Sequence, residues 1–236
     1  ASHERVRNII ADPFDETLPH LVAALDVALI ADPLLAGLSG RWLFAVAGRE
    51  GQVLGEPYDV AFQRLSETSG RLLVGGMGVD CAPADAVAAM LDRARCFLLG
   101  RDDESHWNVR DLPSESPVFA GLAPMNIDAA PPPTPGRHTP DGARHGAFVL
   151  GVPLGMLTIE QIDLLRRVAG EIVVTPWRSI VVRTADVDLD LFAAGGFAVA
   201  AHSPWATLSA CVGAPWCRRT DTPTVALTTA AARSLP

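Results

Sequence analysis

Apolar side chains recur with the spacing of an α-helix in two long stretches of the first half of the chain. Residues 20–38 follow this pattern and end near Gly37, a residue type that often comes just after the last helical turn. Residues 82–99 predict a second helix, because Pro83 stands just after its start, where a missing backbone N–H costs little. The first half is therefore expected to contain two helices.

The second half predicts a shorter, amphipathic helix over residues 158–170. Thr158 is its N-cap candidate, Gln161 stands at the capping-box position, and Gly170 marks its end. A further short helix that ends in glycines is expected within residues 188–199.

Short apolar runs predict the β-strands. They lie at residues 41–47, 71–79, 146–155 and 171–183. The last run is either one strand or two strands broken at Thr175-Pro176. Because helices and strands alternate, the coarse fold class is α+β with two related halves.

The composition changes between residues 125 and 142, where prolines are frequent and no long apolar run occurs. Such a segment is typical of a linker or a surface loop. It separates a first unit of alternating helix and strand, roughly residues 5–112, from a second unit that begins with the β-α-β pattern of residues 146–183.

Length and charge narrow the class of protein. The 236 residues are 49% hydrophobic and 19% charged, which predicts one or two globular domains with a sizeable core. The formal net charge of −8 argues against a general nucleic-acid binder, because phosphate contacts need clustered cations.

No apolar run reaches the roughly 20 residues that a membrane span needs. Four cysteines at irregular spacing do not resemble a secreted disulfide framework, so we expect a cytoplasmic protein.

All 19 cationic side chains are arginine, and the sequence has no lysine. This excludes lysine Schiff-base chemistry and a P-loop that needs its lysine. A site for anions must therefore use arginine, whose planar fork suits carboxylates.

Cys211 and Cys217 form a C-x5-C pair in the stretch SACVGAPWC, where Gly213 and Pro215 would bend the loop. Iron–sulfur ligands occur as such short-spaced pairs, because one loop must direct two sulfurs at one cluster. Two free thiols in a small apolar loop remain the alternative, since free cysteine behaves as a small hydrophobe. The other two cysteines stand elsewhere: Cys96 is expected in the core, and Cys81 has no evident partner.

Four polar residues are candidates for anion contacts. Arg178 ends the stretch TPWR, and a bidentate fork there suits a carboxylate on a large planar ligand, with a structural salt bridge as the alternative. The sequence context alone assigns no role to Arg7 and Asn8 in RNII or to Arg41 in GRWLF.

Taken in order, these segments resemble the sulfite/nitrite reductase superfamily. The stretches that carry the likeness are RNII, GRWLF, LGVPLG, TPWR and SACVGAPWC, and the branch that they resemble most is precorrin-3B synthase. The likeness spans the chain from Arg7 to at least Cys217.

The resemblance implies a nitrite/sulfite reductase-like α+β fold in segments. Residues 1–124 would form a first α+β segment, and residues 125–142 a linker. Residues 143–184 would form a ferredoxin-like segment, and residues 185–236 the start of the iron–sulfur-binding segment. By the same comparison, the chain resembles an enzyme cut at both ends, without the family's first ferredoxin-like segment or its later C-x3-C pair.

The resemblance also implies cofactors and partners. Cys211 and Cys217 would be two of four ligands to a [4Fe–4S] cluster, and a further non-haem iron is expected, with siroheme as the alternative. Arg7, Asn8, Arg41 and Arg178 would face a carboxylate-rich tetrapyrrole. The expected partners are that tetrapyrrole and an electron donor, either a reductase or one linked to NAD(P)H, with no nucleic acid and no membrane.

The expected activity is the oxygen-dependent hydroxylation of precorrin-3A with lactone formation, in aerobic cobalamin biosynthesis. Sulfite reductases carry a K-F-K arrangement, where this chain has Arg41, Trp42 and Leu43. One cation is kept and one is lost, which suits a small anion poorly. The alternatives are a siroheme-dependent sulfite or nitrite reductase and a non-catalytic tetrapyrrole-binding remnant.

Overall fold

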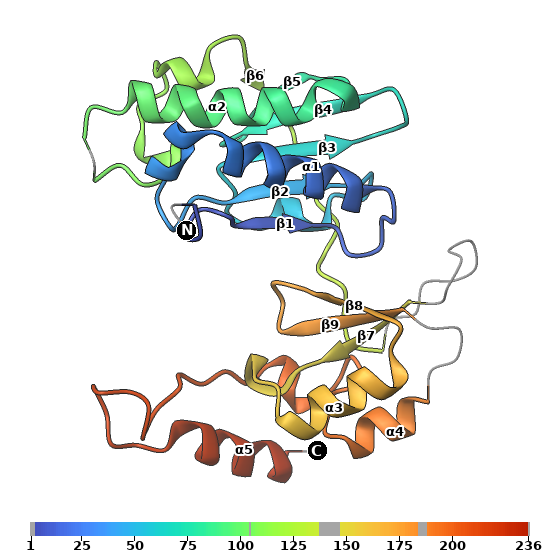
Figure 1. Ribbon diagram of the computed structural model, residues 1–236. Helices are drawn as coiled ribbons and strands as arrows, with labels where there is room; N and C mark the ends of the chain where they lie inside the picture. The colour runs from blue at the N-terminus through green and yellow to red at the C-terminus, as the bar shows by residue number, and fades with distance from the viewer. Residues whose placement is uncertain (1–2, 104, 137–146, 184–187, 236) are drawn as a thin grey trace. The chain divides into compact units, whose positions relative to one another are not determined.

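The computed structural model describes residues 3–103, 105–136, 147–183 and 188–235 (Figure 1). The chain forms two compact units, Ala1–Pro132 and Pro133–Pro236. They divide inside the proline-rich stretch 125–142, of which residues 137–142 lie outside the described part. No helix within the described residues is long and apolar enough to cross a membrane.

The first unit is built on a sheet of six strands in sequential order, with parallel pairing on one side and antiparallel pairing on the other. The strands are β1 (Ile9–Ala11), β2 (Phe44–Ala47), β3 (Val60–Arg64), β4 (Gly70–Val74), β5 (Met77–Asp80) and β6 (Ala123–Pro124). The first three are parallel to one another, and the pairs from β3 onward are antiparallel. The amino ends of β1, β2 and β3 therefore share one edge of the sheet.

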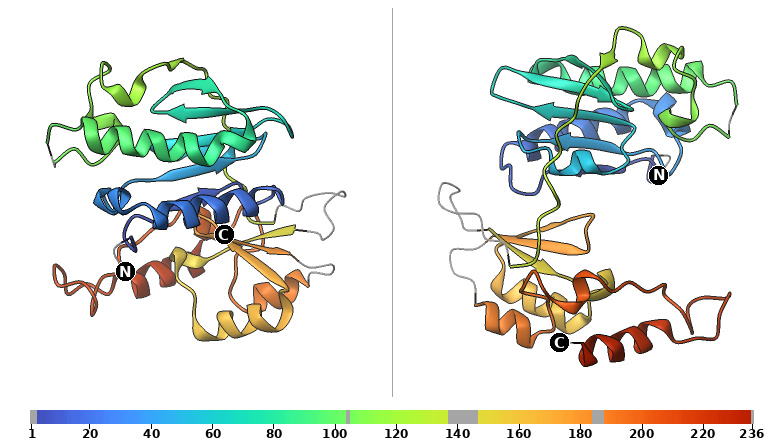
Figure 2. Two further views of the ribbon diagram at one scale, coloured as in Figure 1. Left: turned by 45° about the horizontal axis from the view of Figure 1, so that its top comes forward. Right: turned by 180° about the vertical axis from the view of Figure 1, so that it is seen from behind.

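Two helices, α1 (Leu18–Ala31) and α2 (Ala86–Gly100), lie side by side on one face of this sheet, and residues 125–132 run along the other face (Figure 2). The core fills the space between helices and sheet. Its aromatic part has the Trp42 ring 4.6 Å from the Phe97 ring and 5.9 Å from the Phe44 ring, centroid to centroid. Short 3₁₀ turns complete the unit: η1 (Pro33–Gly37), η2 (Gln52–Gly55), η3 (Pro83–Asp85), η4 (Val109–Asp111) and η5 (Pro117–Phe119).

Two predictions for this unit need correction. The helix expected over residues 20–38 ends at Ala31, because Pro33 cannot continue it and Asp32 instead caps η1 by accepting from the Leu34 N–H. The single strand expected over residues 71–79 is wrong, since two glycines with positive φ turn the chain there into the β4–β5 hairpin. The sequence patterns do not predict strands β1, β3 and β6.

The second unit contains a three-stranded antiparallel sheet in the order β7-β9-β8. Its elements are β7 (Ala147–Gly151), η6 (Pro153–Gly155), α3 (Ile159–Val168), β8 (Glu171–Val174), β9 (Ser179–Arg183), α4 (Leu189–Ala194), η7 (Pro204–Ala206) and α5 (Thr224–Ser234). The run at residues 171–183 is thus two strands, broken where Pro176 stands. Gly146, the predicted first residue of the β7 run, lies outside the described residues.

Helix α3 begins as the sequence predicts. Thr158 accepts a hydrogen bond from the Gln161 N–H, and the Gln161 side chain accepts one from the Thr158 N–H, which is a capping box. Helices α3 and α4 pack on the sheet around Leu150, Ile180 and Phe192. This unit therefore has a core of its own.

Candidate functional site

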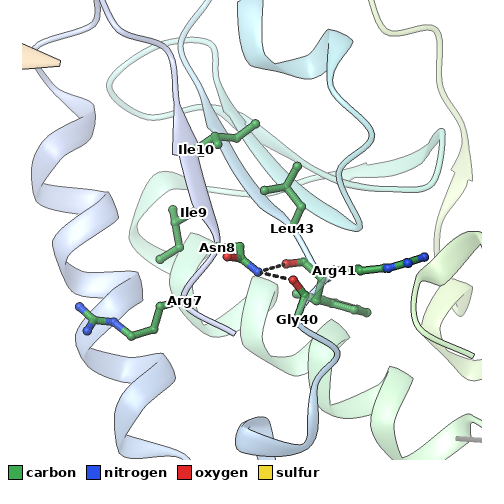
Figure 3. A pocket seen from close by; sticks show the side chains of 8 residues that line it. Arg7, Asn8, Ile9, Ile10, Gly40, Arg41 and Leu43 are labelled. Carbon is green, nitrogen blue, oxygen red and sulfur yellow. Dashed lines mark hydrogen bonds between the residues drawn. The ribbon is translucent and has the colours of Figure 1, made fainter. Parts of the chain in front are cut away.

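A cavity of about 430 Å³ opens at the amino ends of β1 and β2 (Figure 3). Because these strands are parallel, with Ile9 opposite Phe44, the residues just before each strand meet at one edge of the sheet. The cavity is lined by Arg7, Asn8, Ile9, Ile10, Gly40, Arg41, Trp42 and Leu43. Three of the residues expected to contact an anionic ligand are thus brought together.

Asn8 connects the two strand ends. Its side-chain amide donates to the backbone carbonyls of Arg5, Gly40 and Trp42 at 3.2, 3.0 and 3.1 Å, and the backbone carbonyl of Asn8 accepts from the Phe44 N–H at 2.9 Å. Figure 3 draws two of these bonds. The amide N–H groups therefore hold the cavity wall together and are not directed at a ligand.

Arg7 is held by helix α1. Its Nε and Nη2 each donate to the Asp26 carboxylate at 2.7 Å, which is a bidentate ion pair with the Arg7 side chain about half exposed. The hydrogen bond and the charge of Asp26 raise the pKa of Arg7, so this arginine stays cationic. The pair fixes its guanidinium on the α1 side of the cavity.

Arg41 extends to the opposite side of the cavity from Arg7 (Figure 3). Its guanidinium carbon lies 4.5 Å from the centre of the Trp107 ring, which is a cation–π contact. The two arginines thus diverge, and each is oriented by a different element of the first unit.

Sequence reasoning missed Asp59, Trp107 and Asn108, which shape the Arg41 side of the site. Asp59 is 2% exposed, and its carboxylate accepts from the N–H groups of Leu43 and Val109 and from the Asn108 side chain, at 2.9, 2.8 and 3.0 Å. Burial raises the pKa of Asp59, and these hydrogen bonds oppose the rise. Only the N-x-x-D capping pattern at residues 108–111 could have indicated an ordered loop here.

Arg178 lies in the second unit, in the turn between β8 and β9, with φ at +54°. Its Nη1 donates to the Leu208 carbonyl at 2.7 Å, and its side chain packs on Gly155, where an added Cβ would come within 3.1 Å of the Arg178 Cγ. Arg178 thus connects the turn between β8 and β9 to the segment around Leu208. Its predicted contact with a carboxylate of a ligand stays a prediction.

The two cysteines of the C-x5-C pair lie in one loop of the second unit. The loop is closed by a hydrogen bond from the Cys217 N–H to the Gly213 carbonyl at 2.7 Å. Cys211 is exposed, and its sulfur lies 3.6 Å from the Thr224 hydroxyl, which donates to the Cys211 carbonyl at 2.6 Å. The contacts with the Thr224 side chain and the Gly213 backbone lower the pKa of the Cys211 thiol. Cys217 accepts from the Arg219 N–H at 3.4 Å.

No group of three or more His, Cys, Asp or Glu side chains that could hold a metal occurs among the described residues. The loop therefore offers two thiols, and any further ligands must come from elsewhere. Cys81 and Cys96 pack against the core of the first unit, as expected for Cys96, and burial raises the pKa of Cys81.

A second cavity, of about 640 Å³, lies at the carboxyl end of β3, between the starts of α1 and α2. It is lined by Glu16, Thr17, Leu18, His20, Leu21, Ala24, Arg64, Pro83, Ala84 and Val87. None of the residues predicted to bind a ligand lines it. We therefore take the smaller cavity, where the predicted residues converge, as the candidate site.

No protein-family model matches the chain, and no curated protein matches it. Among solved structures, the NirA protein of Mycobacterium tuberculosis is similar at 19% sequence identity, with a TM-score of 0.66. The match covers 96% of this chain and 50% of that one, so the chain spans half the length of the structure that it matches. At this identity the likeness establishes the fold. The α+β fold of the nitrite/sulfite reductase type, expected from the sequence, is confirmed.

Proposed function

We propose that the chain is the tetrapyrrole-binding part of a cytoplasmic oxidoreductase of the sulfite/nitrite reductase type. The reaction we propose is that of precorrin-3B synthase, in which precorrin-3A is hydroxylated with dioxygen and a lactone is closed. The fold shared with NirA supports the superfamily, and the proposal of the tetrapyrrole-modifying branch depends on the residues of the cavity.

Arg7 and Arg41 lie on opposite sides of the cavity, and this observation favours a large ligand with several carboxylates over a small oxyanion. A small oxyanion is held best by cations that converge on it, because Coulomb attraction falls with distance. Here one guanidinium is held by Asp26 on one side and the other stacks on Trp107 on the opposite side. Two separated cations match carboxylates at separate points on the rim of a large planar ligand: Arg41 through its fork, and Arg7 through Nη1, since its Nε and Nη2 donate to Asp26.

The residues present fit half of the ligand set of a [4Fe–4S] cluster. Cys211 has a lowered thiol pKa, which favours the thiolate that ligation requires, and Cys217 lies in the same closed loop. The remaining two ligands would come from a C-x3-C pair of the kind found in the family. A bound cluster would supply one-electron transfer. We propose the further non-haem iron that the resemblance implies without assigning ligands to it.

The proposed reaction balances with an external donor. One oxygen atom of dioxygen becomes the new hydroxyl of the substrate, and the other leaves as water with two protons and two electrons. The lactone closes when a carboxyl O–H of the substrate adds across a double bond of the macrocycle, so this step releases no water and needs no further oxidant. We propose that a reductase or an NAD(P)H-linked donor supplies those electrons. In this scheme Arg7 and Arg41 bind and orient the substrate carboxylates, and Asn8 holds the two strand ends that carry them.

The test is turnover of precorrin-3A under air by the natural-length protein loaded with its cluster. The expected product contains one oxygen atom from isotopically labelled dioxygen. Arg41→Gln should raise KM, whereas Arg49→Gln, an exposed arginine beyond the carboxyl end of β2, should not. Absence of turnover by well-folded, cluster-loaded protein refutes the proposal.

Two other outcomes favour the alternatives. Sulfite or nitrite reduction with the visible absorption of siroheme would identify the protein as a reductase. Tetrapyrrole binding by natural-length protein that never acquires an iron–sulfur spectrum would instead identify a binding protein without catalysis.

A further inference from the structure

Trp107 stands beside Arg41, the arginine of the cavity that makes no ion pair with a carboxylate of the described residues. We infer that Trp107 is the positioning residue for Arg41, holding its guanidinium where it can bind a carboxylate of the ligand. The ligand part of this inference rests on the proposed function. The orientation of Arg41 by the indole is a property of the unliganded protein and can be tested separately.

The Arg41 guanidinium lies over the face of the indole. Its carbon is 4.5 Å from the ring centre, which is a cation–π contact. The N–H groups lie in the guanidinium plane, and a carboxylate binds there in bidentate fashion. Among the described residues no side chain or carbonyl accepts a hydrogen bond from this guanidinium, whereas the Arg7 fork is occupied by Asp26.

The loop that carries Trp107 is fixed to the segment that carries Arg41. The Asn108 side chain donates both to the Arg41 carbonyl at 3.1 Å and to the Asp59 carboxylate at 3.0 Å. Asp111 accepts from the backbone N–H groups of Trp107 and Asn108, each at 2.9 Å, which closes the loop on itself. One buried amide thus sets the distance between the indole and the backbone of Arg41.

This arrangement has a functional consequence because a free arginine side chain samples many rotamers, which binding must then restrict. Trp107 is 44% exposed and makes little contact with the core, so its position is not required for core packing. Holding Arg41 in one orientation before the ligand arrives lowers the entropy lost on binding.

The first arm of the experiment uses NMR on the unliganded chain, with the Arg41 side-chain signals assigned through Arg41→Gln. Ring current should shift these signals upfield in the wild type, less so in Trp107→Phe, and not at all in Trp107→Leu. Arg41 signals that are identical in wild type and Trp107→Leu overturn the inference, whatever the ligand of the protein is.

The second arm measures the Kd for uroporphyrin, a planar tetrapyrrole rich in carboxylates, in a double-mutant cycle. Trp107→Leu should weaken binding about 3- to 10-fold, the range expected for a cation–π contact. In an Arg41→Gln background the same change should have almost no effect. Equal losses in both backgrounds mean that Trp107 acts independently of Arg41, which overturns the positioning role.

The two arms separate this inference from the proposed function. If the wild-type chain does not bind uroporphyrin, the tetrapyrrole proposal fails, and with it the carboxylate-binding part of the inference. The NMR arm still decides whether Trp107 orients Arg41.

Discussion

Replacing Asp59 with asparagine tests whether the hydrogen bonds that Asp59 accepts hold the Arg41 side of the cavity in place. Asp59 is buried and receives three hydrogen bonds, from Leu43, Val109 and the Asn108 side chain. Its Oδ1 accepts from Val109, and its Oδ2 accepts from Leu43 and from the Asn108 side chain. Asparagine has a single acceptor oxygen, so its NH₂ group must face at least one of these donors.

The cost follows from the lost acceptor. A buried N–H left without a partner costs about 1–3 kcal/mol, and the milder desolvation of a neutral amide offsets part of this. We therefore expect Asp59→Asn to lower the free energy of unfolding by about 1–3 kcal/mol. The loop bearing Trp107 should loosen at the same time, so the uroporphyrin Kd should rise about 3- to 10-fold through lost positioning of Arg41.

Asp12→Asn is the matched control. Asp12 is also buried, accepts from the N–H groups of Gly48 and Val53 at 2.8 and 2.7 Å, and lies at the carboxyl end of β1, away from the cavity. Urea unfolding should show a similar loss of stability in both variants, with an unchanged m-value. Only Asp59→Asn should change the Arg41 NMR signals and the uroporphyrin Kd. Equal effects of both variants on binding would refute the reasoning.

Three further predictions concern other parts of the chain. Burial raises the pKa of Asp12 to about 6, so its contribution to the free energy of unfolding should fall by about 3 kcal/mol as the pH rises from about 4 to 6. This slope in urea unfolding should be absent in Asp12→Asn; a retained slope contradicts the assignment. Thr158→Ala removes the cap of α3 and should cost about 1 kcal/mol; an unchanged urea midpoint of the second unit would count against this. In natural-length protein, Cys211→Ala and Cys217→Ala should each abolish iron–sulfur absorption, whereas Cys96→Ala should retain it; a normal spectrum in either of the first two rules out that ligand.

The sequence predicted the fold where local signals agree with the tertiary structure. The capping box at Thr158 and the glycines that end α4 are local signals, and both stand where they are expected. At Thr175-Pro176, where the sequence leaves one strand or two open, the structure has two. The sequence predicts one strand at the β4–β5 hairpin because apolar residues continue on both sides of Gly75 and Gly76, whose positive φ values appear only in the structure. The short strand β3 is almost fully buried, so it lacks the alternation that marks a half-exposed strand.

The candidate site was predictable only in part. Arg41 is the first residue of a run that the sequence predicts as a strand, whereas no strand is predicted after Arg7. The parallel pairing of β1 with β2, which brings the two arginines to one edge, emerges only in the structure. Trp107 and Asp59 reach the same place through a loop and a buried hydrogen-bond network that no sequence spacing encodes. The ion pair of Arg7 with Asp26 depends on how α1 packs, which periodicity alone does not specify.

The most direct test of the central claim is to locate bound uroporphyrin on the chain by NMR chemical-shift mapping. Binding in the cavity at the amino ends of β1 and β2 predicts the largest shifts at residues 7–10 and 40–43. Shifts confined to the second cavity, around Leu21, Arg64 and Val87, would contradict that claim.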